Sequence, residues 1–155
     1  MIESRAREFS KKAVEYFSGN YNCAQSVLLA MQEYYGIPSG GLIPKIATPF
    51  GGGIGRCGSL CGALTGAVLA IGLKYGTETT NLKEKEKSYK LARKLYERFV
   101  KAWGTPFCRE LIGYDLNDPK QLEELRRASI RDNKCARFVQ KSVEILISLE
   151  NESRS

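Results

Sequence analysis

Apolar residues recur along this chain every three or four positions, which is the period of an α-helix that is buried on one side. The first such segment covers residues 3–18, where alanine, valine and phenylalanine share one face, and it stops at Gly19. No segment alternates between apolar and polar residues over the length of a strand. The pattern therefore predicts an all-α fold, a multi-helix bundle. Further helices are predicted over residues 23–36, 42–47, 59–75, 81–103, 106–112, 119–129 and 133–149.

The signals between these segments indicate how the chain is organised. Asn22 can cap the second helix while the side chain of Gln25 reaches back, which is the pattern of a capping box. Residues 49–58 are predicted to form a loop, because they have glycine at positions 51, 52, 53 and 55 and end at Gly58. Because no linker rich in proline or serine and no internal repeat divides the chain, we expect a single helical domain over residues 1–150 and a frayed tail over 151–155.

Much of the formal net charge of +7 lies in the predicted helix over residues 81–103, which carries eight lysines or arginines against three glutamates. Two apolar rows at a spacing of four share the opposite face. We interpret the basic side as a solvated outer face, with an acidic protein partner as the alternative. A nucleic-acid surface is not indicated, since the aromatic residues lie among the apolar ones and no known motif is present. The apolar rows are Leu91, Leu95 and Phe99, and Ala92, Tyr96 and Val100.

The chain shows no feature of export or membrane insertion. Its first residues mix charged and apolar positions at helical spacing, without the continuous apolar run of a secretory signal. The longest nearly apolar stretch, residues 61–73, has thirteen residues, whereas a membrane-spanning helix needs about 20. We therefore expect a cytoplasmic protein without a membrane span. A reducing compartment keeps thiols free or bound to metal, with the intracellular proteins of hyperthermophiles as the exception.

The complete absence of histidine narrows the chemistry that the chain can support. The commonest general base and metal ligand are missing, and so are the mixed cysteine and histidine zinc fingers. Five cysteines remain as candidate ligands, and a domain of 155 residues does not need them as a disulfide skeleton. No carboxylate pair and no pair of nucleophile and base stands out, so a catalytic site of the usual acid–base kind is not indicated.

Four of the five cysteines fall in the predicted first turn of a helix. Unpaired backbone amides and the positive end of the helix dipole stabilise a thiolate there, which lowers the pKa of the thiol. The alternative is that each cysteine is simply a small buried apolar residue. The four are Cys23 after Asn22, Cys61 after Ser59, Cys108 after Thr105 and Cys135 after Asp132.

Spacing alone does not identify the site that these cysteines form. The chain has no C-x-x-C, so the patterns of zinc ribbons, thioredoxins and ferredoxins fail, and any chelation has to be tertiary. Gly53, Gly55 and Gly58 satisfy the dinucleotide fingerprint G-x-G-x-x-G only nominally, because no buried strand precedes them. We expect the glycines to permit close backbone approach, either to another helix or to sulfurs that need amide donors.

Segments spread over nearly the whole chain resemble the C_GCAxxG_C_C family of redox-active proteins. The resemblance rests on residues 21–27, on 50–76 with C-G-A-L-T-G inside it, on 108–115 and on the late Cys135. It implies a redox function and a cysteine module related to that of split-Soret cytochromes, where an iron–sulfur centre is implied. The chain has no haem motif, so only the cysteine module carries over. The cysteines at the family's four positions are Cys23, Cys61, Cys108 and Cys135.

Four functions are compatible with these residues. The leading one is an electron-transfer or redox-sensing protein whose four family cysteines hold an iron–sulfur cluster as cofactor, with a two-iron cluster preferred to a four-iron one. The second is a structural zinc site with the same four ligands. The third is a metal-free dithiol switch, pairing for example Cys57 with Cys61 or Cys108 with Cys135. The fourth is a helical interaction module in which the cysteines only pack.

In the leading interpretation the chain is a redox carrier or accessory protein rather than a stand-alone enzyme. Its partner is then another redox protein, which we expect to be acidic because the predicted helix over residues 81–103 is basic. The sequence leaves open whether the chain also forms a homodimer. The interpretation predicts that the four sulfurs converge. Cys57 lies in the glycine-rich loop, off the family pattern, and we expect it to be an accessory thiol, either a spare ligand or a resolving thiol.

Overall fold

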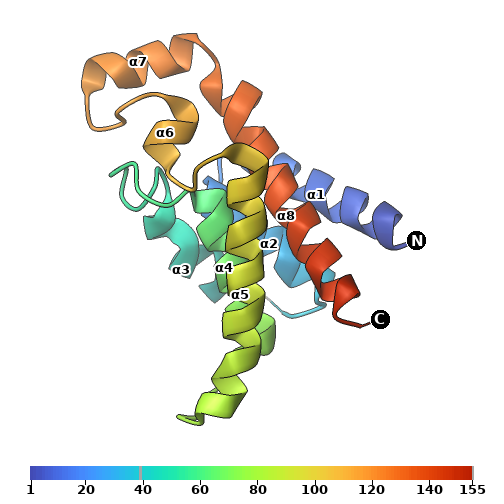
Figure 1. The fold of residues 1–155 in the computed structure, drawn as a ribbon. Helices are drawn as coiled ribbons and strands as arrows, with labels where there is room; N and C mark the ends of the chain where they lie inside the picture. Colours follow the sequence, from blue (N-terminus) through green and yellow to red (C-terminus); the bar gives the residue numbers. More distant parts are fainter. Residues whose placement is uncertain (39, 155) are drawn as a thin grey trace.

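The computed structural model describes residues 1–38 and 40–154. Within these residues the chain is helical, with one isolated antiparallel bridge and no sheet, so the predicted all-α class is confirmed (Figure 1). The helices are α1 (Ile2–Ser18), α2 (Cys23–Tyr34), α3 (Leu42–Ala47), α4 (Gly62–Tyr75), α5 (Leu82–Trp103), α6 (Cys108–Ile112), α7 (Pro119–Arg127) and α8 (Ala136–Glu152), with a 3₁₀ turn η1 (Thr48–Phe50) and a π turn η2 (Arg131–Cys135).

All the predicted helices are present; α6 begins two residues later than predicted, and α4 and α8 begin three residues later. The start of α4 is delayed because Leu60 forms the isolated antiparallel bridge with Phe107, so that Cys61 rather than Ser59 is the N-cap residue. The start of α8 is delayed because the chain first makes the wider turn η2. At its other end, α8 continues two residues into the segment expected to be a frayed tail.

The centre of the bundle is α2. It packs against α1, α3, α4 and α8, and eight of its twelve residues are buried. The approach of α4 to α2 is close because Gly66 has no side chain: a Cβ there would lie 2.5 Å from the carbonyl oxygen of Ala24. Although α4 is apolar on all sides, no helix in the described part of the chain combines the length and the hydropathy needed to cross a membrane.

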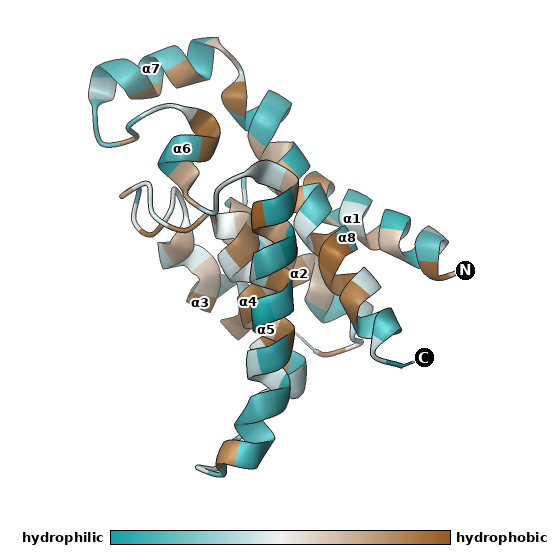
Figure 2. Ribbon diagram, in the orientation of Figure 1, coloured by the Kyte–Doolittle hydropathy of each residue, from teal (hydrophilic) through white to brown (hydrophobic). Residues whose placement is uncertain are grey.

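The basic helix α5 covers α4 and α8 from outside (Figure 1). Leu95 and Phe99 are buried, whereas lysines and arginines form the outer side of the helix, as predicted (Figure 2). Tyr96 was expected on the apolar face but is 42 % exposed, because contact mainly with two neighbouring helices buries only a narrow stripe of α5. The first half of α5 extends beyond the body of the bundle (Figure 1), and Leu82 and Tyr89 in this half are exposed.

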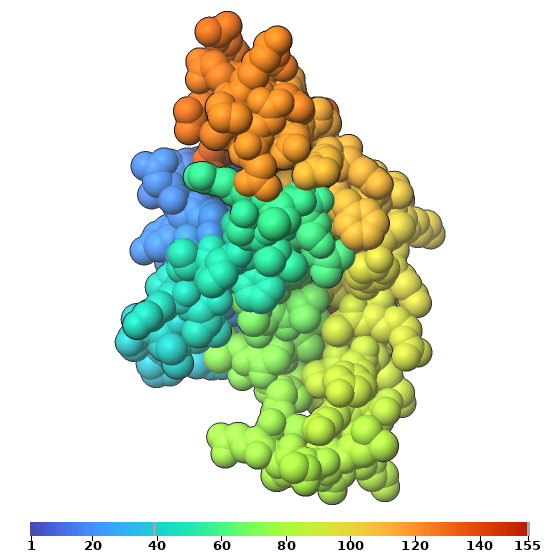
Figure 3. Space-filling view, turned by 90° about the vertical axis from the view of Figure 1, so that its left-hand side faces the viewer, coloured from blue at the N-terminus to red at the C-terminus, as the bar shows by residue number. Residues whose placement is uncertain are grey.

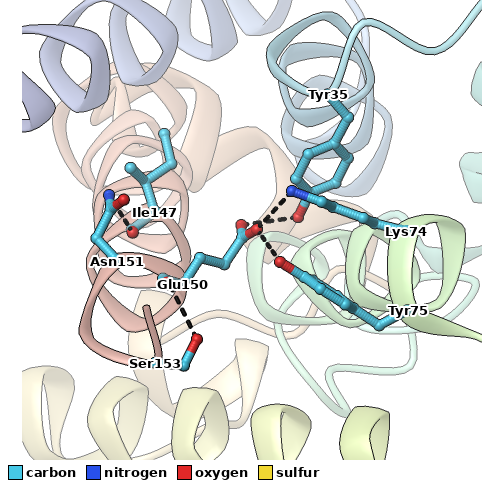
Figure 4. Close-up of polar contacts among 7 residues, drawn as sticks. All are labelled: Tyr35, Lys74, Tyr75, Ile147, Glu150, Asn151 and Ser153. Carbon is cyan, nitrogen blue, oxygen red and sulfur yellow. Dashed lines mark hydrogen bonds and ion pairs between the residues drawn. The ribbon is translucent and has the colours of Figure 1, made fainter. Parts of the chain in front are cut away.

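A buried carboxylate ties α2, α4 and α8 together near the end of α8. Glu150 is only 1 % exposed. Its side chain accepts hydrogen bonds from the hydroxyls of Tyr35, at 2.9 Å, and Tyr75, and it lies 3.4 Å from the ammonium of Lys74 (Figure 4). Burial raises the pKa of both tyrosines, so both hydroxyls stay protonated donors.

The two long terminal helices pack against each other and define the two ends of the bundle. The chain enters the cysteine-bearing end through α1, whose last residue lies just before Cys23 in the sequence, and leaves it through α8, which begins directly after Cys135. Both termini of the described chain therefore lie away from these two cysteines (Figure 1).

Candidate functional site

Four cysteines that are far apart in the sequence line one cavity with a volume of about 740 Å³. Cys23 is the first residue of α2, Cys61 directly precedes α4, Cys108 is the first residue of α6, and Cys135 is the last residue of η2. All five cysteines are free thiols. Cys57 is exposed and does not contribute to the cavity wall. The fold thus separates Cys57 from the other four.

Glycines of the glycine-rich loop and of α4 bring the backbone close to two of these cysteines. A Cβ on Gly53 would lie 2.7 Å from the Cβ of Cys108, and a Cβ on Gly62 would lie 3.0 Å from the Cβ of Cys23. Residues 52–56 all have positive φ, although two of them are not glycine, so the loop makes a left-handed turn that L side chains rarely adopt. The expected use of glycine for close backbone approach is confirmed.

Backbone hydrogen bonds hold the cysteine of α6 beside the cysteine of α4. The amide of Cys108 donates to the carbonyl oxygen of Ser59 at 2.7 Å. The amide of Cys61 donates to the carbonyl oxygen of Pro106 at 2.8 Å. Because these bonds belong to the main chain, they fix the spacing of the two cysteines whatever the state of their thiols.

The predicted capping box is present and positions Cys23. The side chain of Asn22 accepts a hydrogen bond from the amide of Gln25 at 2.9 Å, and the side chain of Gln25 accepts one from the amide of Asn22 at 3.0 Å. The side-chain amide of Asn22 also donates to the carbonyl oxygen of Thr48 at 2.9 Å. The start of α2 is therefore tied to η1, from which the chain enters the glycine-rich loop.

Arg131 connects the segment before Cys23 with the turn that carries Cys135. Its Nη2 atom donates to the carbonyl oxygens of Phe17, at 2.6 Å, and Tyr21, at 2.9 Å. Its guanidinium carbon lies 3.7 Å from the centre of the Phe17 ring. The sequence pattern does not single out this arginine; its signal is a basic residue about one helical turn before a cysteine.

The thiols of Cys23 and Cys135 contact each other in the cavity. The hydrogen bond between them raises the pKa of Cys23, which burial raises further. The same bond lowers the pKa of Cys135 against the opposing effect of burial, with help from the charges of Arg131 and Lys134. Cys135 is therefore the cysteine of the cavity that favours the thiolate.

The other two cysteines of the cavity favour the neutral thiol. Burial raises the pKa of Cys61 to about 12, although the amides of Ala63 and Leu64 at the start of α4 oppose it. Burial also raises the pKa of Cys108 to about 11. The expectation that helix N-termini lower the pKa of all four thiols is wrong for these two and for Cys23, since burial and neighbouring sulfurs outweigh the helix amides.

The four cysteines share a cavity without forming a ready-made site for a single ion. In residues 1–38 and 40–154, no group of three or more cysteine, aspartate or glutamate side chains is close enough to hold a metal ion. The sulfurs are nevertheless near enough that the charges of Cys61, Cys108 and Cys135 raise the pKa of Cys23. A group bound by all four therefore has to span a gap wider than one coordination sphere.

The contact between Cys23 and Cys135 differs from the pairs suggested by the sequence. Cys57, which the dithiol alternative pairs with Cys61 as one example, lies outside the cavity, and its carbonyl oxygen accepts a hydrogen bond from Arg109 at 3.4 Å. The contact that does form joins Cys23 near the start of the chain with Cys135 near its end. Sequence spacing carries no signal for this pair, because only the packing of α1, α2 and α8 brings its members together.

Comparison with known proteins finds a match for the cysteine-bearing part of the chain. Residues 21–149 match the family described as "Putative redox-active protein (C_GCAxxG_C_C)". A protein of Archaeoglobus fulgidus, described as an uncharacterized protein, is 28 % identical over 151 residues, covering 92 % of this chain and 93 % of its own length. No solved structure matches. The matched residues include all four cysteines of the cavity.

Proposed function

Because the chain belongs to the C_GCAxxG_C_C family of redox-active proteins, we propose that it transfers or senses electrons through an iron–sulfur cluster. The cluster's ligands in this proposal are Cys23, Cys61, Cys108 and Cys135. The observation that carries it is that these four thiols, from four separate segments, line one cavity. Four thiolates are the usual ligands of such clusters, and a bound cluster supplies one-electron redox chemistry.

The width of the cavity favours a cluster over a single zinc ion. Zinc held by four thiolates needs every sulfur about 2.3 Å from one point. No three candidate side chains meet in this way among the described residues, so zinc binding would require the cysteines to move inward. A two-iron cluster distributes its four cysteine ligands over two metal atoms and bridging sulfides, so it spans a wider gap with less movement of the chain.

The surroundings of the cysteines can offset the charge of bound thiolates. The amides of Ala63 and Leu64 act on Cys61, and the side chains of Arg131 and Lys134 act on Cys135. Such donors and charges around the ligand sulfurs set the potential of a bound cluster. Three of the four cavity thiols have a raised pKa, so cluster binding must release protons and should strengthen as the pH rises.

A metal-free dithiol switch is the second candidate, and the contact between Cys23 and Cys135 favours it. In this reaction the Cys135 thiolate attacks a disulfide of a partner protein and forms a mixed disulfide. The Cys23 sulfur then displaces the partner's second thiol, leaving a Cys23–Cys135 disulfide. The chain loses two electrons and two protons, and the partner disulfide takes up both as it becomes a dithiol.

The partner that we propose is an acidic redox protein. The lysines and arginines of α5 are mostly exposed, and the helix is hydrophilic over most of its outer side (Figure 2). Complementary charge speeds the encounter of two proteins and orients them before they dock. Free thiols suit a reducing compartment, so we propose that the protein works in the cytoplasm.

Purification without oxygen tests the cluster. We expect a coloured protein with about two irons and two acid-labile sulfides per chain, since a two-iron cluster has this composition. A colourless protein with one zinc per chain would contradict the cluster and support the zinc site. A metal-free protein with reversible oxidation would support the dithiol switch.

Two serine variants test the ligand set. Cys61→Ser should abolish iron binding, because a buried cluster that lacks one thiolate is left with an open position. Cys57→Ser is the matched control: Cys57 is four residues away but lies outside the cavity, so its iron content should be unchanged. Equal loss of iron in both variants would show that the four ligands are wrongly chosen.

A further inference from the structure

The cavity is larger than its four sulfurs require. Its volume of about 740 Å³ lies within the range of roughly 300–1,000 Å³ found for small-molecule sites. Metal–sulfur bonds of about 2.3 Å confine a two-iron core to roughly 100 Å³. Most of the cavity therefore lies beyond the cysteines, and we call this part the outer compartment. Its wall includes Arg56, Leu116, Leu122, Leu125, Arg126 and Arg131.

The outer compartment is roofed by α7, which stands away from the body of the bundle above the glycine-rich loop (Figures 1 and 3). No residue of α7 is buried. Leu122 and Leu125 are three positions apart, so they share one face of α7, and both line the cavity together with Leu116. Leucines in the wall of a cavity this wide expose apolar surface to water, and a ligand with an apolar body would cover it.

The outer compartment is also positively charged. Arg56, Arg126 and Arg131 contribute to its wall against the single carboxylate of Asp132. Arg126 approaches Glu123 only to 3.9 Å, with both side chains more than half exposed, so this ion pair neutralises little of its charge. Arg131 donates to carbonyl oxygens, which are neutral, so apart from its effect on Cys135 no carboxylate contact offsets its charge. The charge balance therefore selects an anion.

We propose that the outer compartment binds a small organic anion with an apolar body, held beside the cysteines of the cavity. The leucines contact the apolar body, and the guanidinium groups recognise its carboxylate, sulfonate or phosphate. The inference goes beyond the proposed function, because an electron carrier needs only the cysteines, whereas this compartment gives the redox site a ligand of its own. Iron content and anion binding are measured separately, so the failure of one leaves the other standing.

The test uses 8-anilinonaphthalene-1-sulfonate, which has an aromatic body and one sulfonate and fluoresces in apolar sites. We expect saturable binding of one probe to the full chain purified without oxygen. The neutral compound N-phenyl-1-naphthylamine has the same body and lacks the sulfonate. It should bind about tenfold more weakly or worse, which is the effect of losing one charge-assisted hydrogen bond. Unsaturable binding, or equal affinity for the two probes, would overturn the proposal.

Two neighbouring arginines of α7 give matched variants. Both are ion-paired with Glu123, but only Arg126 belongs to the cavity wall, whereas Arg127 is 79 % exposed. Arg126→Glu should weaken binding of the sulfonate about tenfold or more, and Arg127→Glu should leave it within about twofold. Leu122→Asp should weaken both probes, because it removes apolar wall. Circular dichroism of each variant checks that the helices are retained.

The variants also define the results that count against the compartment. Equal weakening by Arg126→Glu and Arg127→Glu would mean that the sulfonate responds to the net charge of α7 and not to the cavity. Unchanged affinity in both Arg126→Glu and Leu122→Asp would mean that the probe binds elsewhere. Either result overturns the proposal. The two arginine variants give this answer without Leu122→Asp if that variant does not fold.

Discussion

Replacing Gly53 by alanine tests whether close contact at the glycine-rich loop builds the cysteine site. Gly53 has a φ of +71°, a conformation that costs alanine about 1–2 kcal/mol. The added Cβ would also lie 2.7 Å from the Cβ of Cys108 and 2.7 Å from main-chain atoms of Ser59. Neither neighbour can retreat without straining the hydrogen bond between the amide of Cys108 and the carbonyl oxygen of Ser59. Overpacking of this kind costs about 1–3 kcal/mol more.

The matched control is Gly55→Ala in the same loop. Gly55 has a φ of +54°, but nothing lies within 4 Å of the position that its Cβ would take. We therefore expect Gly55→Ala to lower the free energy of unfolding by the conformational cost alone, about 1–2 kcal/mol. Gly53→Ala should lower it by about 2–5 kcal/mol, because the steric cost is added. The difference between the two variants isolates the contact with Cys108 and Ser59.

Urea unfolding of the reduced, metal-free chain, followed by circular dichroism, measures both losses. The rate at which a chromogenic disulfide reacts with Cys108 reports how well the loop covers this cysteine. Gly53→Ala should speed this reaction, since the loop must move away from α6, and Gly55→Ala should not. Equal losses of stability in the two variants, with Cys108 equally protected, would refute the reasoning, because backbone conformation alone would then account for the glycine at position 53.

Three further predictions concern buried ionisable groups. Glu150→Ala should lower the free energy of unfolding by about 3 kcal/mol in thermal unfolding, because two tyrosine hydroxyls and a lysine lose their acceptor. Glu123→Ala at the surface should lower it by under about 0.5 kcal/mol, and similar losses in the two variants would contradict the buried network. In a metal-free chain that carries Cys57→Ser, iodoacetamide should modify Cys135 before Cys61, because the pKa of Cys135 is lowered and that of Cys61 is about 12. Mass spectrometry of the alkylated peptides checks the order, and equal rates of modification would contradict it. Because the pKa of Cys61 is raised in the folded state, the thiol of the unfolded chain ionises at a lower pH than the folded one. The contribution of Cys61 to the free energy of unfolding should therefore be full below pH 9 and fall as the pH rises toward 12. Urea midpoints measured against pH should fall less steeply in Cys61→Ala.

The helices could be predicted from the sequence because burial on one side imposes a regular spacing of apolar residues. The predicted end of α1 at Gly19, the capping box at Asn22 and the bounds of α3 all depend on residues within one or two helical turns. The start of α4 could not be predicted in the same way. It depends on the pairing of Leu60 with Phe107, which are far apart in the sequence, and no local signal announces that pairing.

The candidate site, like the helices, could be predicted from the sequence only where local residues or the family pattern determine it. The cysteine set follows from the family pattern, and the use of glycine follows from the density of glycine in one loop. The pKa directions depend on burial and on which sulfurs meet, so the helix ends alone gave the wrong sign for Cys61 and Cys108. The position of α7 over the cavity could not be predicted either, because Leu122 and Leu125 have the spacing of any amphipathic helix. Only the tertiary structure places them in the wall of the cysteine cavity.

The course of α1 and α8 bears on how the molecule could be attached to a support. Each helix has 17 residues and so spans about 25 Å. One ends shortly before Cys23 and the other begins directly after Cys135, so the start of α1 and the end of α8 lie away from these cysteines (Figure 1). A tether attached beyond the outer end of either helix would fix the protein to a bead or an electrode with its cysteine-bearing end facing the solution, where a diffusing partner could reach it.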